Sequence, residues 1–311
     1  MRSSQVKAIF VALAVLSLLY AAVQLLSGDE QSEGGDDIAG AVHGGLELIR
    51  VVGPEPSDSL RLEDRDGTWT VNGYPADTAA IRRLAEGLES ARVGRLVARS
   101  ASNHARLGVL EDSARLVEIG PAGSPDVVFL LGGAGADGRY VRFPPSDDVF
   151  SVPAASVRLL LRPLEEWRNR IVASVDTAAV GRISVSRGDQ EGLVVLERDT
   201  ADPAGAWSLD GTTADSAVVA GLLQESATLE ATGFPSDSVA FAVDFSSPAA
   251  TLEMYDSDEP GAAPALSLLF LTSPDARDFL VRRADDPLAY RISAAQAERL
   301  LPTRSMLEGR E

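Results

Sequence analysis

A glycine-rich segment is the first part of this chain whose residues could do cofactor chemistry. Gly133, Gly135 and Gly138 have the spacing Gly-x-Gly-x-x-Gly and follow an apolar run. Dinucleotide-binding folds place this spacing between a strand and a helix, because the amides at the helix N-terminus bind the pyrophosphate. Here residues 139–143 continue as a strand-like segment, and the matching residues 272–278 in the second half contain no glycine. We therefore predict a hairpin turn and no cofactor site.

A histidine offers a second possible chemistry, hydrolysis. His104 lies close in sequence to Ser102 and Asp112, which supply the residue types of a base, a nucleophile and an orienting carboxylate. The Gly-x-Ser-x-Gly elbow that exposes the serine of many hydrolases is absent. The other histidine, His43, lies in a polar segment, and the second half has none. We predict a solvated or locally hydrogen-bonded His104 and no catalytic residue, with a hydrolase kept as the third hypothesis.

Acidic clusters offer a third chemistry, metal binding. Asp256, Asp258 and Glu259 could hold a calcium ion, but they lack the glycine and the spacing of an EF-hand loop. Aspartate pairs at residues 147–148 and 285–286 fall in predicted turns. Solvation of loops explains all three clusters, so no metal site is predicted. The chain has no cysteine, which excludes disulfides, thiol catalysis and thiolate metal ligands.

The elements that position these residues come from an internal repeat. The segment GTWTVNGYPAD at residues 67–77 recurs as GAWSLDGTTAD at residues 205–215. The two tryptophans could be stacking platforms for a sugar, but their alternation with Val71 and Leu209 predicts core positions. The aspartate that ends each segment fits the N-cap of a following helix. We assign to the repeated structural core Trp69, Trp207, Gly73 and Gly211, and to helix N-caps Asp77 and Asp215.

Each half of the chain has the pattern of a mostly antiparallel α+β module. Apolar alternation through residues 60–71, interrupted by a polar turn, predicts a β-hairpin. Ile81, Leu84 and Leu88 then lie on one stripe of a predicted helix. Further short strands and a closing helix are predicted at residues 116–119, 127–131, 140–143, 149–152 and 154–161 in the first half, and at 252–255, 266–271, 279–281, 290–292 and 294–301 in the second.

An apolar stretch near the N-terminus predicts a membrane span. Residues 8–26 carry no charge, and at about 1.5 Å per residue they just cross a hydrocarbon core of roughly 30 Å. Arg2 and Lys7 precede the stretch and acidic residues follow it, which favours a cytoplasmic N-terminus and an extracytoplasmic, periplasmic chain. A cleaved signal peptide, with Ala21 and Ala22 near the cleavage site, stays an alternative.

These patterns give one fold class, α+β: an N-terminal transmembrane helix followed by two tandem, duplicated, mostly antiparallel modules. A helical connector with Trp167 packed between the modules is predicted to join them. The predicted boundaries are 1–7 for the cytoplasmic N-terminus, 8–26 for the transmembrane helix, 27–45 for a flexible acidic and glycine-rich tether, 46–163 for the first module, 164–179 for the connector, 180–302 for the second module and 303–311 for a tail.

The charge balance limits the partners. The chain has 28 basic and 46 acidic residues, a formal net charge of −18. Nucleic acids and anionic lipid surfaces need Lys and Arg to neutralise phosphate, so both are disfavoured as partners.

Several of these motifs together resemble the bacterial family called domain of unknown function 4340. They are the predicted N-terminal membrane helix, the Trp-x-(Val/Leu)-x-Gly-x-x-Ala-Asp stretch, Ser-x-Ser-Asn-x-x-x-Leu-Gly at residues 100–108 and the segment 139–142. The second half departs from this pattern at residues 234–245. The resemblance implies an auxiliary, membrane-anchored companion of gliding-motility-type ABC transport systems. It implies no catalytic residues.

The expected function is therefore a non-catalytic scaffold or accessory subunit in the inner membrane, with its bulk outside the cytoplasm. Its expected partners are membrane proteins, the permease subunits of an ABC-type transport, gliding or surface-export complex. The alternative is an extracytoplasmic protein that binds a glycan or a peptide in a groove between the two modules.

Overall fold

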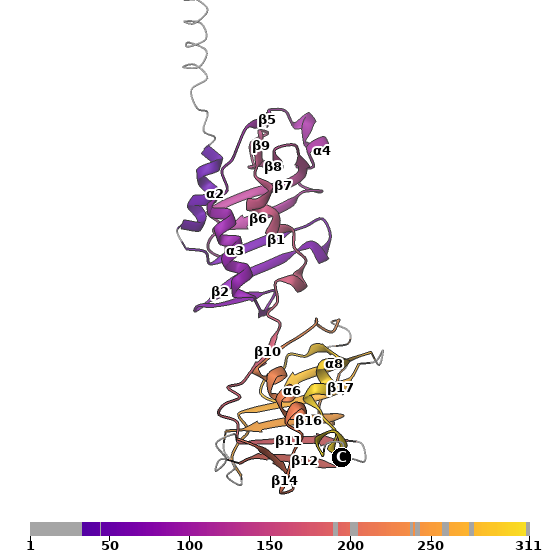
Figure 1. Cartoon of the computed structure of the whole chain (residues 1–311). Helices are drawn as coiled ribbons and strands as arrows, with labels where there is room; N and C mark the ends of the chain where they lie inside the picture. Colours follow the sequence, from indigo (N-terminus) through magenta and orange to yellow (C-terminus); the bar gives the residue numbers. More distant parts are fainter. Residues whose placement is uncertain are drawn as a thin grey trace, which may run out of the picture. The chain divides into compact units, whose positions relative to one another are not determined.

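The computed structural model describes residues 33–43, 45–188, 192–199, 205–236, 239, 243–256, 261–273 and 277–308. The chain divides into two compact units, Met1–Arg168 and Asn169–Glu311 (Figure 1). The predicted span at residues 8–26 lies outside the described residues. Within the described part, no helix is long and apolar enough to cross a membrane.

The first unit is built on a nine-stranded sheet in the order β4-β3-β2-β1-β6-β7-β8-β9-β5. All of its neighbouring strands run antiparallel. The strands are β1 Leu48–Val52, β2 Leu60–Arg65, β3 Thr68–Val71, β4 Tyr74–Pro75, β5 Leu96–Ala98, β6 Arg115–Ile119, β7 Val127–Gly135, β8 Gly138–Arg142 and β9 Val149–Val152.

Helices cover one face of this sheet. Figure 1 shows α2 (Glu33–His43) and α3 (Thr78–Glu89) crossing it. Alternating strand residues such as Ile49, Val51 and Leu62 are buried against the apolar stripe of α3 in a single core. The remaining helical segments are α4 His104–Leu107, α5 Ala154–Val157, η1 Pro56–Asp58, η2 Ala101–Asn103, η3 Arg158–Leu161 and η4 Leu164–Glu166.

The second unit has an eight-stranded antiparallel sheet in the order β14-β13-β12-β11-β16-β17-β18-β19. Its strands are β11 Arg182–Arg187, β12 Leu193–Arg198, β13 Trp207–Leu209, β14 Thr212–Thr213, β16 Ala250–Tyr255, β17 Leu266–Thr272, β18 Asp278–Arg283 and β19 Tyr290–Ser293. Beside it lie a two-stranded sheet of β10 (Ile171–Ser174) and β15 (Thr228–Glu230), and helices α6 (Ser216–Ala227), α8 (Ala294–Leu300) and α9 (Arg304–Leu307).

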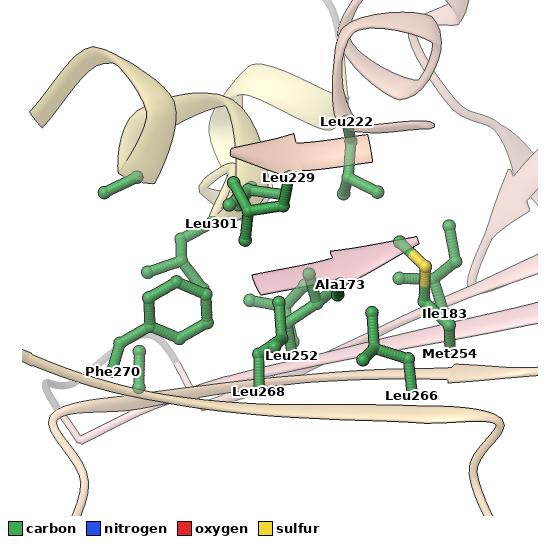
Figure 2. Packing of buried hydrophobic residues seen from close by; sticks show 14 of the residues in the cluster. Ala173, Ile183, Leu222, Leu229, Leu252, Met254, Leu266, Leu268, Phe270 and Leu301 are labelled. Carbon is green, nitrogen blue, oxygen red and sulfur yellow. The ribbon is translucent and has the colours of Figure 1, made fainter. Parts of the chain in front are cut away.

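The core of the second unit lies between these layers. Figure 2 shows Leu222 of α6 and Leu229 of β15 facing side chains of the large sheet. Leu252, Leu268 and Phe270 are fully buried on the sheet side. Such alternate burial along β16 and β17 is what a sheet covered on one face requires.

The two large sheets have the same strand order. Each of the first eight strands in the first sheet has its counterpart ten strand numbers later in the second sheet. The edge position of β5 beside β9 is taken in the second unit by Gly233, which bridges to Arg291 of β19. The prediction of a mixed α+β fold with mostly antiparallel strands is confirmed.

Two predicted boundaries were wrong. Residues 33–43 of the predicted flexible tether form α2, because Ile38, Ala41 and Val42 lie three and four residues apart and join the first core. The predicted helical connector contains only η4, and residues 171–174 form β10. The side chain of Trp167, which was predicted to pack between the modules, is fully buried in the core of the first unit.

The end of each unit is bonded to the N-terminus of its long helix. The amide of Asp77 donates to the Trp167 carbonyl oxygen at 2.8 Å, and the amide of Asp215 donates to the Leu307 carbonyl oxygen at 2.8 Å. Leu307, which falls in the predicted C-terminal tail, is fully buried in the second core. Leu307 is thus the counterpart of Trp167.

The repeated tryptophans and glycines belong to the hairpins that precede these helices. Trp207 is buried in the second core, and Trp69 is half-buried against the first. Gly73 and Gly211 have φ angles of +86° and +79°, and the residue before each also has a positive φ. Two consecutive positive φ angles define the two-residue turns that favour Asn-Gly and Asp-Gly.

Asp77 and Asp215 are the N-caps of α3 and α6. Asp77 Oδ1 accepts hydrogen bonds from the amides of Ala79 at 2.8 Å and Ala80 at 3.2 Å. Asp215 Oδ1 accepts from Ala217 at 2.9 Å and Val218 at 3.1 Å. These carboxylates satisfy helix amides that have no partner within the helix.

Asp77→Ala and Asp215→Ala are each expected to lower the free energy of unfolding of their own unit by about 1 kcal/mol. Peptide-resolved hydrogen exchange would show faster exchange in α3 for the first variant and in α6 for the second. The matched controls, Asp77→Asn and Asp215→Asn, keep the acceptor oxygen and should remain close to the parent chain. Equal effects of Ala and Asn would contradict the capping role.

Candidate functional site

The glycine-rich segment is the turn of a hairpin. Gly135 of β7 pairs with Gly138 of β8, and β8 continues directly from it. The register of β7 shifts between Leu131 and Ala134, and the guanidinium of Arg139 donates to the Gly132 carbonyl oxygen at 2.6 Å. A dinucleotide site needs a helix N-terminus at this point. The strand that follows instead leaves these glycines with a role in hairpin geometry.

His104 is buried and bonded to the backbone. His104 is only 4% exposed to solvent, and its Nε2 atom lies 2.9 Å from the Asp147 carbonyl oxygen. Ser102 Oγ lies 2.9 Å from Ser100 Oγ instead. Among the described residues, neither Ser102 nor Asp112 forms a hydrogen bond with His104. The structure does not assemble the three residues of the hydrolytic hypothesis.

A buried arginine holds the segment around His104 onto the sheet. Arg142 Nε donates to the Val109 carbonyl oxygen at 3.1 Å, and Nη1 donates to the Ser146 carbonyl oxygen at 3.3 Å. In the second unit, Arg282 aligns with Arg142, and its guanidinium lies 4.8 Å from the ring centre of Phe245. Both arginines hold a covering segment on the sheet face, which is a structural role.

The two aspartates of the cluster at residues 285–286 have ordinary partners. Asp285 pairs with Arg283, and this side-chain hydrogen bond lowers the pKa of Asp285. Asp286 Oδ1 accepts from the Leu288 amide at 2.9 Å. Asp258 and Glu259 lie outside the described residues. Within the part of the chain that the structure describes, no group of three His, Asp or Glu side chains is arranged to hold a metal ion.

A cavity in the second unit is the strongest candidate for a binding site. Its volume is about 690 Å³, within the usual range for small-molecule sites. It lies where β11, β16, β17 and β18 meet α8 and α9. Its lining residues are Arg187, Gly188, Ala249, Ala250, Thr272, Phe279, Ala297, Glu298, Leu301, Thr303 and Met306.

Arg187 is the basic residue of the lining and occupies a position that alternation would give to an apolar residue. Ile183 and Val185 of the same strand are buried on the core face, and Arg187 follows two residues later. It pairs in register with Ala250 of β16. Its Nη1 donates to the carbonyl oxygen of Leu301 at 2.9 Å, at the C-terminus of α8. The carbonyl dipoles at a helix C-terminus favour a cation there.

Apolar side chains form much of the remaining lining. Phe279 is half-buried, and Met306 is 47% exposed, one of the large apolar residues that the second unit leaves open to water. Leu301 is buried beside them. Thr272, Thr303 and the exposed carboxylate of Glu298 add polar groups. The lining suits binding of a partly apolar ligand. Among the described residues that line it, no nucleophile has an adjacent base.

In the first unit, arginine occupies the place of Ala250. Val117 of β6 and Leu252 of β16 pair with matching positions of the central strands β1 and β11. Arg115 precedes Val117 by two residues and Ala250 precedes Leu252 by two residues, so each lies on the same face of its strand as that residue. Arg115 lies 3.2 Å from a carboxylate oxygen of Asp58.

A second arginine of the first unit occupies the place of Phe279. Val141 of β8 and Val281 of β18 are both buried core residues, and Arg139 and Phe279 precede them by two positions. Burial lowers the pKa of Arg139, and the nearby charge of Arg115 lowers it further.

Comparison with protein families gave a match. Residues 69–240 match the family model described as Domain of unknown function (DUF4340). The chain belongs to the DUF4340 family. Comparisons with curated proteins and with solved structures gave no match.

The DUF4340 match begins at Trp69 and contains most of the motifs noted in the sequence. His104, Arg142, Trp167 and Trp207 all lie inside it. Most of the cavity lies beyond residue 240, since only Arg187 and Gly188 of its lining fall inside the match. The part of this DUF4340 protein that matches the family model therefore contains few of the residues that line the cavity.

The cavity residues were absent from the sequence predictions. The available signals were Arg187 at a core-face position, and small residues at 249, 250 and 297 where the facing elements leave space. An isolated arginine at a strand end more often reaches solvent. Only the register between β11 and β16 shows that Arg187 shares a face with Ala250.

Proposed function

We propose that this DUF4340 protein is a membrane-tethered, extracytoplasmic scaffold or accessory subunit of an ABC-type transport, gliding or surface-export complex. The observation that carries the proposal is the role of the repeated residues. Asp77 and Asp215 cap helices, Trp69 and Trp207 pack against cores, and the paired glycines form turns. These roles support a protein that works by presenting rigid surfaces.

The position of the first unit along the chain adds to this proposal. Residues 27–32 separate the proposed span from α2, which begins at Glu33 and whose Ile38 is buried in the first core. A fully extended segment of this length reaches roughly 20 Å. The proposed span would therefore keep the first unit near the membrane surface, where permease subunits are accessible.

Cross-linking in membranes tests this function. The chain has no cysteine, so single cysteines at exposed positions such as Thr78 or Ser216 can carry a photo-cross-linker. We expect cross-linked adducts with permease subunits, and co-purification of those subunits in mild detergent. The control is the same chain with residues 1–26 replaced by a cleavable export signal, which should lose most of the adducts. Repeated recovery of the chain alone, with no adduct at any position, would contradict the proposal.

Ligand binding is the second candidate function. The observation that favours it is the cavity of about 690 Å³ in the second unit, with an arginine and exposed apolar side chains in its lining. Binding there needs residues of the second unit only. It is compatible with an accessory role in transport, but does not depend on it.

A further inference from the structure

We propose that a groove on the first unit binds a small phosphate monoester through Arg158, with Arg83 and Arg162 beside it. The groove lies between α3 and the segment formed by α5 and η3, and its volume is about 530 Å³. The inference depends neither on the association with a transporter nor on the cavity of the second unit. It follows from the shape of the groove, the partners of its arginines and the net charge of the chain.

Small residues and arginines line this groove together. Gly87 and Ala155 contribute no long side chain to it. A Cβ atom at Gly87 would lie 3.0 Å from the Ser156 carbonyl oxygen, so α3 and α5 approach closely at this point. The three arginines of the lining are exposed or half-buried. The small residues therefore leave space between the helical segments, and the arginines supply N–H donors that a ligand from solvent can reach.

Arg158 is the arginine whose charge is available to an anion. Among the described residues, its side chain forms no hydrogen bond and no ion pair. Glu86, the acidic residue of the lining, likewise forms no ion pair within the part of the chain that the structure describes. An oxyanion that binds Arg158 therefore displaces no existing side-chain partner, and its hydrogen bonds to the guanidinium are strengthened by charge.

Arg83 and Arg162 have partners, but each keeps further donors for the same anion. Arg83 Nη2 lies 3.7 Å from Asp77 Oδ2, and Arg83 Nε donates to the Ala79 carbonyl oxygen at 3.1 Å. Arg162 Nε lies 3.0 Å from Glu166 Oε2. A guanidinium has five N–H donors, so these contacts leave several unused. They are exposed pairs of the weak kind, which orient the two side chains without saturating them.

The matching groove of the second unit differs in its charges. It lies between α6 and α8, and two of its lining residues, Arg299 and Glu225, form an ion pair at 2.7 Å. Glu298 stands where the repeat would place Arg158, at the offset of 140 residues that relates the β8–β9 pair to the β18–β19 pair. The shared fold therefore does not require arginines at this place, which favours a separate role for those of the first unit.

The net charge of the chain favours a compact anion in this groove. A chain with a net charge of −18 repels long polyanions and extended anionic surfaces, which would meet acidic residues beyond the groove. A phosphate monoester concentrates about two negative charges on three terminal oxygens, and guanidinium groups pair with phosphate through parallel hydrogen bonds. Glu86 can accept a hydrogen bond from a hydroxyl or ammonium group on the body of the ester. A soluble ester and a single lipid headgroup share this chemistry.

The test places a thiol in the groove of the full-length chain in dodecyl maltoside micelles. Ala155→Cys introduces a cysteine into a chain that has none, at an exposed position of the lining. Its rate of reaction with a maleimide is measured with and without each probe, and the ratio of the two rates cancels the effect of nearby charges on the thiol itself. The probes are glycerol 3-phosphate, glycerate and glycerol, which have similar polar bodies. The control is Ala295→Cys, the exposed counterpart in the second unit.

We expect glycerol 3-phosphate to slow the reaction of Ala155→Cys at least threefold, glycerate to slow it less and glycerol to leave it unchanged. The Ala295→Cys rate should not change with any probe. Dioctanoyl phosphatidic acid in the same micelles, compared with dioctanoyl phosphatidylcholine, presents the monoester on a lipid. Protection by this lipid alone assigns a lipid headgroup, and protection by glycerol 3-phosphate assigns a soluble ester. Equal protection by glycerate and glycerol 3-phosphate, equal protection of the two cysteines, or no protection by either ester overturns the inference.

Further substitutions in Ala155→Cys separate direct contact from overall charge. Arg158→Gln should raise the concentration of ester that gives half-maximal protection at least fivefold. Arg82→Gln removes the same charge from an exposed position of α3 outside the lining and should raise that concentration less than twofold. Arg158→Lys keeps the charge but loses the planar donors, so its effect should lie between these two.

Equal effects of Arg82→Gln and Arg158→Gln would show that only the overall charge matters and would overturn the assignment of Arg158. Circular dichroism establishes that each variant is folded. The comparison of probes on Ala155→Cys decides the inference even if Arg158→Gln failed to fold.

Discussion

Replacement of Trp167 by alanine is expected to lower the free energy of unfolding of the first unit by about 3–5 kcal/mol. Trp167 is one of the largest fully buried side chains, and it packs in the core with residues of the sheet and of α3. Its removal leaves a cavity that the surrounding strands fill only in part. The carbonyl of the same residue bonds the amide of Asp77, so a shift of this segment would also weaken the start of α3.

The conservative variant separates packing from hydrogen bonding. The indole Nε1 of Trp167 is buried and, among the described residues, has no hydrogen-bond partner. Trp167→Phe therefore loses volume but no hydrogen bond, and it should cost roughly 1–2 kcal/mol. A cost close to that of the alanine variant would show that the indole nitrogen has a partner after all.

Leu307→Ala provides the matched variant in the second unit, with an expected cost of about 2–5 kcal/mol. Hydrogen exchange resolved by peptide can follow the two units in one sample. Trp167→Ala should accelerate exchange in α3 and in the sheet of the first unit, and Leu307→Ala should do so around α6. Loss of protection in the opposite unit for either variant would contradict the assignment of these residues to separate cores.

The equivalence of Trp167 and Leu307 could have been predicted from the sequence. The repeat matches Val141 with Val281 at an offset of 140 residues, and the same offset matches Trp167 with Leu307. Trp167 and Leu307 differ in type, and their flanking residues differ as well, so the similarity between the two halves is weak at this point. Their shared hydrogen bond to a helix N-cap is a tertiary feature, which no periodicity in the sequence records.

The hairpins and long helices were predictable because their signals are local. Alternation through β2 and β3 and the apolar stripe of α3 each follow from a few neighbouring residues. Helix α2 was missed because its glycines and aspartates have low helix propensity, and packing of Ile38 against the core outweighs that propensity. Strand β10 was missed because its partner β15 is more than fifty residues away.

The cavity could not be predicted, because it results from several small side chains that different elements bring to one place. A sequence shows that Ala249, Ala250 and Ala297 are small, but not that they face the same space. The register of four strands and the end of α8 bring them together. The repeat helps only after the fold is known, when Arg115 and Arg139 can be matched with Ala250 and Phe279.

Gly138→Ala is expected to destabilise the first unit by about 3 kcal/mol or more. A Cβ atom at this position would lie 2.0 Å from the carbonyl oxygen of Val152, far inside van der Waals contact. The φ angle of Gly138 is +141°, a conformation that residues with a side chain rarely adopt. The strain acts on the β8–β9 pair, where Arg139 is directly opposite Val152.

This substitution also distinguishes the two interpretations of the Gly-x-Gly-x-x-Gly spacing. If the glycines approached a pyrophosphate, alanine would weaken dinucleotide binding and leave the unfolding energy of the empty protein nearly unchanged. If Gly138 is required by the hairpin, urea unfolding followed by circular dichroism should show the loss of stability with no nucleotide present. The structure predicts the second result, because the atom that an added methyl group meets belongs to β9.

Gly221→Ala is a control for which we expect the opposite change in the free energy of unfolding. Gly221 lies inside α6, and a Cβ atom there would meet nothing within 4 Å. Alanine at this position should stabilise the second unit by about 0.5–1 kcal/mol, because it restricts the unfolded chain and favours the helix. A protein in which Gly221→Ala stabilises and Gly138→Ala is tolerated would refute the close contact between β8 and β9. The glycines would then need a function outside the hairpin.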